Sequence, residues 1–180
     1  FVNAGGTFGA PILPATSSGR AVAIGNVDGE GNPDVVTVNG ASVVLVRQAS
    51  TGPVAFKAAM SASVKTAGAD LRDVALFDMN GDVYLDAAAA NRGNSCVARF
   101  NTNPAGKVFQ YADCVPVPVA PELIVAGDLD LNGSTDLAVA GAGAVSVLLA
   151  DAAAPGGYRI ATHGGVTAPS RLLATDVDGD

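Results

Sequence analysis

The stretch NVDGEGNPD, at residues 26–34, recurs along the chain with the same spacing of oxygen-bearing side chains. It returns as DMNGDVYLD at 78–86 and DLDLNGSTD at 128–136, and a fourth copy begins as DVDGD at 176–180. The starts are 52, 50 and 48 residues apart, so each phrase indicates one unit of about fifty residues. Oxygen donors at positions 1, 3, 5 and 9 of a short loop are typical of a site for a hard cation.

Four short extended segments are expected in each unit. An apolar alternation leads into the acidic phrase, two further runs follow it, and a fourth segment carries an aromatic residue after a Gly/Pro turn. The aromatic residues are 48, 53 and 49 apart, which gives a second register that agrees with the first. They are Phe8, Phe56, Phe109 and Tyr158. The other expected strands lie at 21–26, 35–38, 43–46, 73–78, 87–90, 97–100, 123–128, 137–140, 145–149 and 172–176.

Repeated units of four antiparallel strands are typical of the blades of a β-propeller. The sequence therefore predicts an all-β fold, with about three complete four-stranded blades and two partial ones in one domain. The end of a preceding blade is expected at 1–19, three blades at 20–69, 70–120 and 121–169, and the start of the next at 170–180. Because a propeller closes with four to eight blades, the missing blades are expected from the same polypeptide or from a neighbouring chain.

Calcium is the cation that fits these loops best, because only oxygen donors are offered. Calcium accepts six to eight oxygens in flexible geometry, whereas zinc prefers nitrogen or sulfur. The sequence predicts about three Ca²⁺ sites and a fourth, incomplete one. The expected ligands are Asn26, Asp28, Glu30 and Asp34 with the carbonyl of Asn32; Asp78, Asn80, Asp82 and Asp86 with the carbonyl of Tyr84; Asp128, Asp130, Asn132 and Asp136 with the carbonyl of Ser134; and Asp176, Asp178 and Asp180 in the fourth phrase.

Two alternatives bear on these loops. An EF-hand needs an acidic residue at loop position 12, but those positions hold Thr37, Ala89 and Val139. Asp, Asn and Gly are also ordinary turn residues, and this explanation becomes weaker with each repetition of the pattern. At position 6 a glycine-like conformation is expected, so the β-branched Val83 makes the second loop the one least suited to a metal.

The composition restricts the classes of partner. With 49% hydrophobic and 15% charged residues the chain suits a packed domain rather than a disordered one. The net charge is −7, but 12 of the 17 acidic residues lie in the four acidic phrases, so bound ions explain the acidity better than a basic partner does. The ten Lys and Arg residues are scattered, which argues against nucleic-acid binding. No stretch has the roughly 20 apolar residues of a membrane-spanning helix.

Cys96 and Cys114 are the only cysteines and flank an expected hairpin with its turn at 101–106. On neighbouring strands they would lie about three residues out of register, which allows a disulfide; two buried thiols are the alternative. A disulfide, together with calcium, would indicate an extracellular protein, either secreted or on the cell surface.

The phrases GTFGAP at 6–11 and NVDGEGNPDVVTV at 26–38 resemble the outer strand and the calcium loop of FG-GAP or VCBS repeats, which occur in integrin alpha-subunit propellers and bacterial surface proteins. The resemblance spans essentially the whole chain. It implies a propeller, commonly of seven blades, with calcium in the blade loops of a secreted or surface-anchored protein. Glu30, Val83 and Leu131 depart from the family pattern in individual loops.

The function expected from these features is that of a non-catalytic extracellular module that binds a protein or glycan ligand. One alternative is a scaffold propeller in a secreted enzyme that acts on polysaccharides or lipids, and another is a structural subunit of a filament or surface layer. No catalytic residue is expected. The single histidine, His163, is interpreted as a surface residue, and Ser17 and Ser18 as polar loop residues without an identifiable base.

Overall fold

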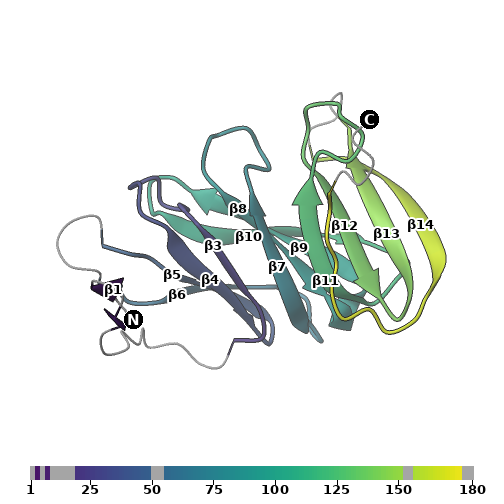
Figure 1. Ribbon diagram of the computed structural model, residues 1–180, viewed down its shortest axis with the longest axis horizontal. Helices are drawn as coiled ribbons and strands as arrows, with labels where there is room; N and C mark the ends of the chain where they lie inside the picture. Colours follow the sequence, from purple (N-terminus) through teal and green to yellow (C-terminus); the bar gives the residue numbers. More distant parts are fainter. Residues whose placement is uncertain (1–2, 5–6, 9–18, 50–54, 152–155, 176–180) are drawn as a thin grey trace.

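The computed structural model describes residues 3–4, 7–8, 19–49, 55–151 and 156–175. Within these ranges the chain is built of β-strands, with one 3-10 turn at Arg92–Asn94 as the single helical segment. The short strands β1 (Asn3–Ala4) and β2 (Thr7–Phe8) pair with each other, and the remaining strands form three four-stranded antiparallel sheets (Figure 1). The all-β part of the prediction is therefore confirmed.

Each sheet is a meander, in which strands that follow one another in the chain also lie side by side. The first sheet contains β3 (Val22–Gly25), β4 (Asp34–Asn39), β5 (Ser42–Val46) and β6 (Met60–Ser63). The second contains β7 (Leu71–Phe77), β8 (Asp86–Asn91), β9 (Cys96–Asn103) and β10 (Val108–Pro116). The third contains β11 (Pro121–Gly127), β12 (Asp136–Gly141), β13 (Gly143–Ala150) and β14 (Tyr158–Val166).

The acidic phrases connect the first and second strands of the three sheets. The last residue of each phrase, Asp34, Asp86 or Asp136, is the first residue of the second strand. The three connections lie along the same edge of the molecule, at the top of Figure 1. The repeated pairing register therefore places the acidic loops at equivalent positions of successive sheets.

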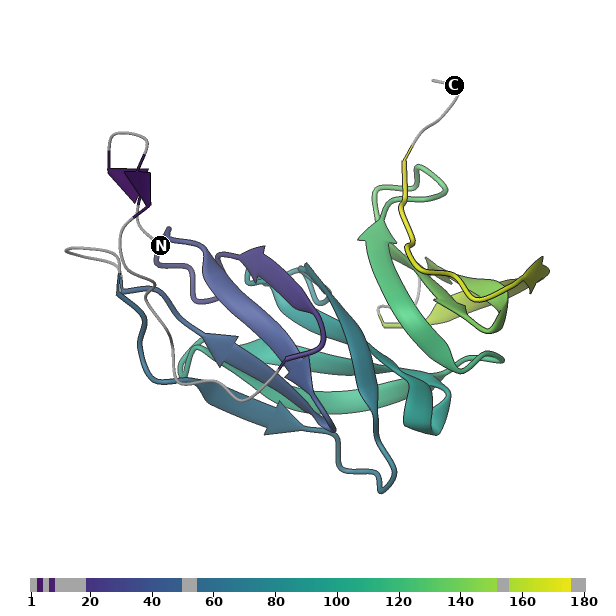
Figure 2. The same cartoon turned by 60° about the horizontal axis from the view of Figure 1, so that its bottom comes forward.

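The second sheet is packed between the other two (Figure 2), and its strand β8 is buried on both faces. Side chains alternate along a strand, so Ala87 and Ala89 lie in the cluster shared with the first sheet, and Ala88 and Ala90 in the cluster shared with the third. All four alanines are fully buried. Small side chains on β8 therefore let neighbouring sheets approach closely.

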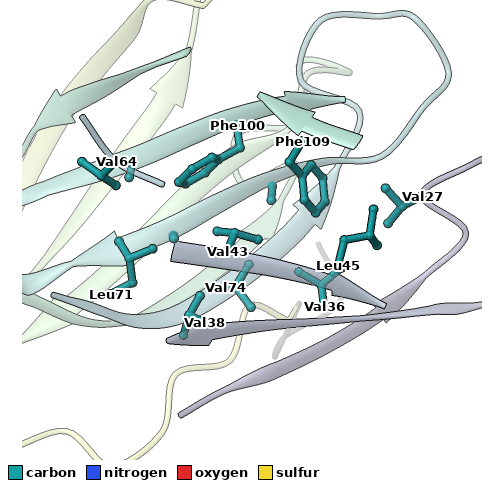
Figure 3. Packing of buried hydrophobic residues seen from close by; sticks show 13 residues of the cluster. Val27, Val36, Val38, Val43, Leu45, Val64, Leu71, Val74, Phe100 and Phe109 are labelled. Carbon is teal, nitrogen blue, oxygen red and sulfur yellow. The ribbon is translucent and has the colours of Figure 1, made fainter. Parts of the chain in front are cut away.

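The cluster between the first and second sheets combines valines and leucine of the first sheet with aromatic residues of the second (Figure 3). Val36, Val43 and Leu45 face Phe100 and Phe109, and all five are buried. The cluster between the second and third sheets is built in the same way from different residues, which include Phe77, Val97, Ile124, Leu137, Val139 and Leu148. Burial of apolar side chains in these two clusters is the main source of stability of the fold. The chain contains no tryptophan, so smaller side chains fill both clusters.

Two expected strand positions differ from the structure. Residues 172–175 lie outside any strand, whereas the equivalent strands β3, β7 and β11 each pair with the strand after their acidic loop; residue 176 lies outside the described residues. Phe56 forms an isolated bridge with Gln48 and precedes β6, whereas Phe109 and Tyr158 lie within β10 and β14.

Cys96 on β9 and Cys114 on β10 are joined by a disulfide, with their Cα atoms 5.6 Å apart. A register shift between Tyr111 and Asp113 places Cys114 opposite Ala98, two residues from Cys96 rather than the expected three. The bond therefore joins neighbouring strands within the second sheet. Among the described residues no helix is both long and apolar enough to cross a membrane.

Candidate metal centres in the acidic loops

The three acidic loops share one backbone conformation. Positions 4 and 6 have positive φ angles in every loop, and glycine occupies most of these positions. The exceptions are Val83, with φ 69°, and Leu131, with φ 57°, whose side chains are 86% and 80% exposed. Val83 is expected to disfavour a positive φ angle, but its loop follows the same path as the others. The hydrogen bonds of the loop and the strands on either side hold it in this conformation.

The side chain at position 1 closes each loop by accepting a hydrogen bond from the backbone N–H of position 6. Asn26 Oδ1 accepts from Gly31 at 3.2 Å. Asp78 Oδ2 accepts from Val83 at 2.8 Å, and the Asp128 carboxylate accepts from Gly133 at 2.9 Å. The position 1 oxygens thus point into the loop, toward the place that a bound cation would take.

The aspartate at position 9 ties each loop to the third strand of its sheet. Asp34, Asp86 and Asp136 are fully buried. In every case Oδ2 accepts the N–H of position 2, and Oδ1 accepts an N–H at the end of the third strand or, for Asp34, two residues beyond it. The donors are Val27 at 2.9 Å and Gln48 at 2.9 Å, Met79 at 3.0 Å and Thr102 at 2.7 Å, and Leu129 at 2.7 Å and Ala150 at 2.7 Å.

These backbone partners of position 9 were not foreseen from the sequence, because they depend on how the third strand pairs beside the loop. Burial raises the pKa of Asp34 and of Asp86, and the backbone hydrogen bonds oppose that effect. A carboxylate oxygen that accepts one hydrogen bond keeps a second lone pair. The position 9 carboxylate can therefore hold the loop and still contact a cation.

The third loop gathers three carboxylates around one point. Oxygens of Asp128, Asp130 and Asp136 lie within 4.8 Å of one another. Calcium binds oxygen at about 2.3–2.6 Å, so one ion can reach all three. Asn132 accepts the N–H of Ser134 at 2.7 Å through its own Oδ1. The donor set, three carboxylates with nearby amide and carbonyl oxygens, fits a hard divalent cation.

In the second loop the side chains at positions 3 and 5 bond to each other. Asn80 Nδ2 donates to Asp82 Oδ2 at 3.2 Å, and the N–H of Asp82 donates to Asn80 Oδ1 at 2.9 Å. Asp82 Oδ1 also accepts the N–H of Tyr84 at 3.0 Å. The negative charges of Asp82 and of Asp78 help to raise the pKa of Asp86, after burial itself. The four oxygen-bearing side chains thus lie in one loop, but its three carboxylates do not converge as those of the third loop do.

In the first loop the carboxylates at positions 3 and 5 face basic side chains. Asp28 is buried, and Glu30 contacts Lys57 at 2.9 Å and Lys107 at 2.8 Å. The amide of Asn32 donates to the carbonyl of Ala49 at 2.9 Å. Asp176, Asp178 and Asp180, expected in a fourth site, lie outside the described residues.

The other polar residues considered in the sequence lie apart from these loops or outside the described chain. His163 is exposed on β14, where it pairs in register with Val145. Ser17 and Ser18 lie outside the described residues. Cys96 and Cys114 form the disulfide and are not metal ligands. Among the described residues, oxygen atoms are therefore the donors that the loops offer.

A scan against protein-family models finds no match to this chain, and a search of curated proteins finds no significant match. The interpretation of the acidic loops therefore depends on their own geometry.

Proposed function

We propose that the chain is part of a calcium-binding β-propeller, in which the three sheets are consecutive blades and acidic loops hold calcium ions. The observation that carries calcium binding is the third loop, where Asp128, Asp130 and Asp136 bring oxygens within 4.8 Å of one another. Three negative charges at this separation repel one another unless a cation lies between them. The resemblance of the sequence to FG-GAP and VCBS repeats agrees with this proposal.

Equivalent residues in the three sheets support the propeller. Val22, Val74 and Ile124 each lie four residues before an acidic phrase. Val74 is 6% exposed and Ile124 is 4% exposed, each within the cluster shared with the preceding sheet, but Val22 is 65% exposed. The face of the first sheet that carries Val22 is therefore the face that another sheet of the same kind covers in a propeller.

Two further observations support a non-catalytic extracellular role. The disulfide between Cys96 and Cys114 is the kind of bond that persists in oxidising compartments. The loop carboxylates at positions 1 and 9 accept backbone hydrogen bonds, which suits a structural role for them. The proposed ligand is a protein or a glycan. A glycan array tests the second, and hydrolysis of polysaccharides by this chain alone would contradict the non-catalytic role.

The calcium proposal is tested with Asp130→Asn. Calcium should raise the melting temperature of the wild-type chain by several degrees over its value in EDTA, because an ion that binds only the folded state stabilises it. Asp130 is exposed, so the variant should melt like wild type in EDTA and lose part of the calcium-dependent rise.

Differential scanning calorimetry in EDTA and in calcium measures both effects. Glu122→Gln, which removes a surface carboxylate that pairs with Arg92 at 3.2 Å, is the matched control and should keep the full rise. Identical melting curves of the wild type in EDTA and in calcium would rule out calcium binding by these loops.

A further inference from the structure

The first acidic loop differs from the others in the basic side chains around its carboxylates. Lys57 Nζ lies 2.9 Å from Glu30 Oε2, and Lys107 Nζ lies 2.8 Å from Glu30 Oε1. Asp28 is 2% exposed, and its Oδ2 accepts no hydrogen bond. That oxygen lies 3.8 Å from Lys57 Nζ and 4.0 Å from a guanidinium nitrogen of Arg47. Three positive side chains thus surround the two carboxylates that precede position 9.

The equivalent places in the other two sheets provide less positive charge to their loops. Lys57 follows the aromatic residue of its unit, and the same place holds Gln110 in the second sheet and Arg159 in the third. Arg159 approaches Asp130 only to 3.8 Å and its side chain is 72% exposed. Within the described part of the chain, no ion pair joins Lys or Arg to a carboxylate of the second loop.

The lysines compete directly with a divalent ion for the same oxygens. Each Glu30 oxygen already accepts from an ammonium group, and the Asp28 oxygen that accepts no hydrogen bond lies 3.8 Å from Lys57 Nζ. A calcium ion would need these oxygens at about 2.3–2.6 Å and would then lie within a few ångström of the ammonium groups. Repulsion between like charges opposes that arrangement.

The ion pairs also cross the junction between two sheets. Glu30 belongs to the loop between β3 and β4 of the first sheet, and Lys107 directly precedes β10 of the second sheet. The two residues are 77 positions apart in the chain. A cation supplied by the neighbouring sheet thus contacts the loop whose charge it neutralises.

We propose that the first acidic loop carries its own cations: the ammonium groups of Lys57 and Lys107 replace a divalent ion there, and the junction between the first and second sheets is independent of metal. This inference rests on the proposed function for the second and third loops, which bind calcium. The sequence predicts a calcium site in each of the three loops. The proposal instead confines calcium binding to the second and third loops.

Calorimetric titration with calcium chloride tests which loops bind the ion. Asp28→Asn should leave the number of bound calcium ions unchanged, whereas Asp130→Asn should lower it by one. The double variant Lys57→Gln/Lys107→Gln should gain one ion, and adding Asp28→Asn to it should remove that gain. Lys65→Gln, an exposed lysine away from the loop, is the matched control and should bind as many ions as wild type. A loss of one ion in Asp28→Asn, or no gain in the double lysine variant, would overturn the proposal.

A second measurement in EDTA tests the ion pairs without any metal. Lys107→Gln should lower the melting temperature by about 1–3 °C, the size expected for a partly exposed ion pair. In the Glu30→Gln background the same substitution should have little effect, because the partner is already gone. Equal shifts in both backgrounds would contradict the cross-sheet ion pair. This result does not depend on calcium, so it tests the ion pair separately from the proposed function. If the proposed function is wrong, no variant will bind calcium in the titration.

Discussion

Val83 adopts the left-handed backbone conformation that glycine adopts without strain, with φ 69°. A β-branched side chain costs about 1–2 kcal/mol in this conformation, and the side chain is 86% exposed, so little burial compensates the cost. At the residue scale, the acidic loops therefore repeat a backbone path more faithfully than they repeat side chains. Hydrogen bonds from position 6 to position 1 and from position 2 to position 9 maintain that path.

Val83→Gly should stabilise the protein by about 1 kcal/mol, because it removes strain at a positive φ angle. Urea unfolding in EDTA measures the change without a contribution from metal. The matched control is Val22→Gly, which changes an exposed valine in strand β3 and should destabilise the protein. Equal destabilisation by the two substitutions would show that position 6 is not strained.

At the scale of the element, β8 shows why the chain is rich in alanine. Each of its residues is buried, and the alanines alternate between the clusters on the two faces of the second sheet. Valines, leucines and aromatic residues pack against these alanines on both faces and leave room only for small side chains. A run of alanines that could form a helix on propensity alone is therefore a strand, because it pairs with β7 and β9.

Ala88→Val should destabilise the protein by about 1–3 kcal/mol, because added methyl groups overpack a fully buried position between two sheets. Ala161→Val, at an exposed position of strand β14, is the matched control and should be nearly neutral. Chemical unfolding of both variants measures the difference. A neutral Ala88→Val would mean that the junction between the second and third sheets has free space.

At the scale of the whole molecule, the three sheets repeat the same four-stranded meander, and the first sheet has an open apolar face. Val22 is 65% exposed and Ile24 is 70% exposed on β3. Val35 and Val46 line the same surface hollow as Val22. Apolar surface of this kind favours association, either with a further sheet of the same polypeptide or with another copy of the chain.

This 180-residue chain should associate at high concentration through this face. Val22→Lys/Ile24→Lys should abolish the association and leave the melting temperature nearly unchanged, because both side chains are exposed in the single chain. Val74→Lys, at the equivalent but buried position of β7, should instead prevent stable folding. Sedimentation velocity and thermal melting test these outcomes, and a wild-type chain that stays monomeric at all concentrations would contradict the prediction.

The units, the strand order within them and the oxygen-bearing loop positions can be predicted from the sequence, because they depend on local spacing and on side-chain alternation. The aspartates 34, 86 and 136 begin the second strand of each sheet as the repeat indicated. Which cations face each loop depends instead on contacts between sheets. Lys107 meets Glu30 across 77 residues of chain, and such a contact depends on the packing of one sheet on another, which no local pattern records.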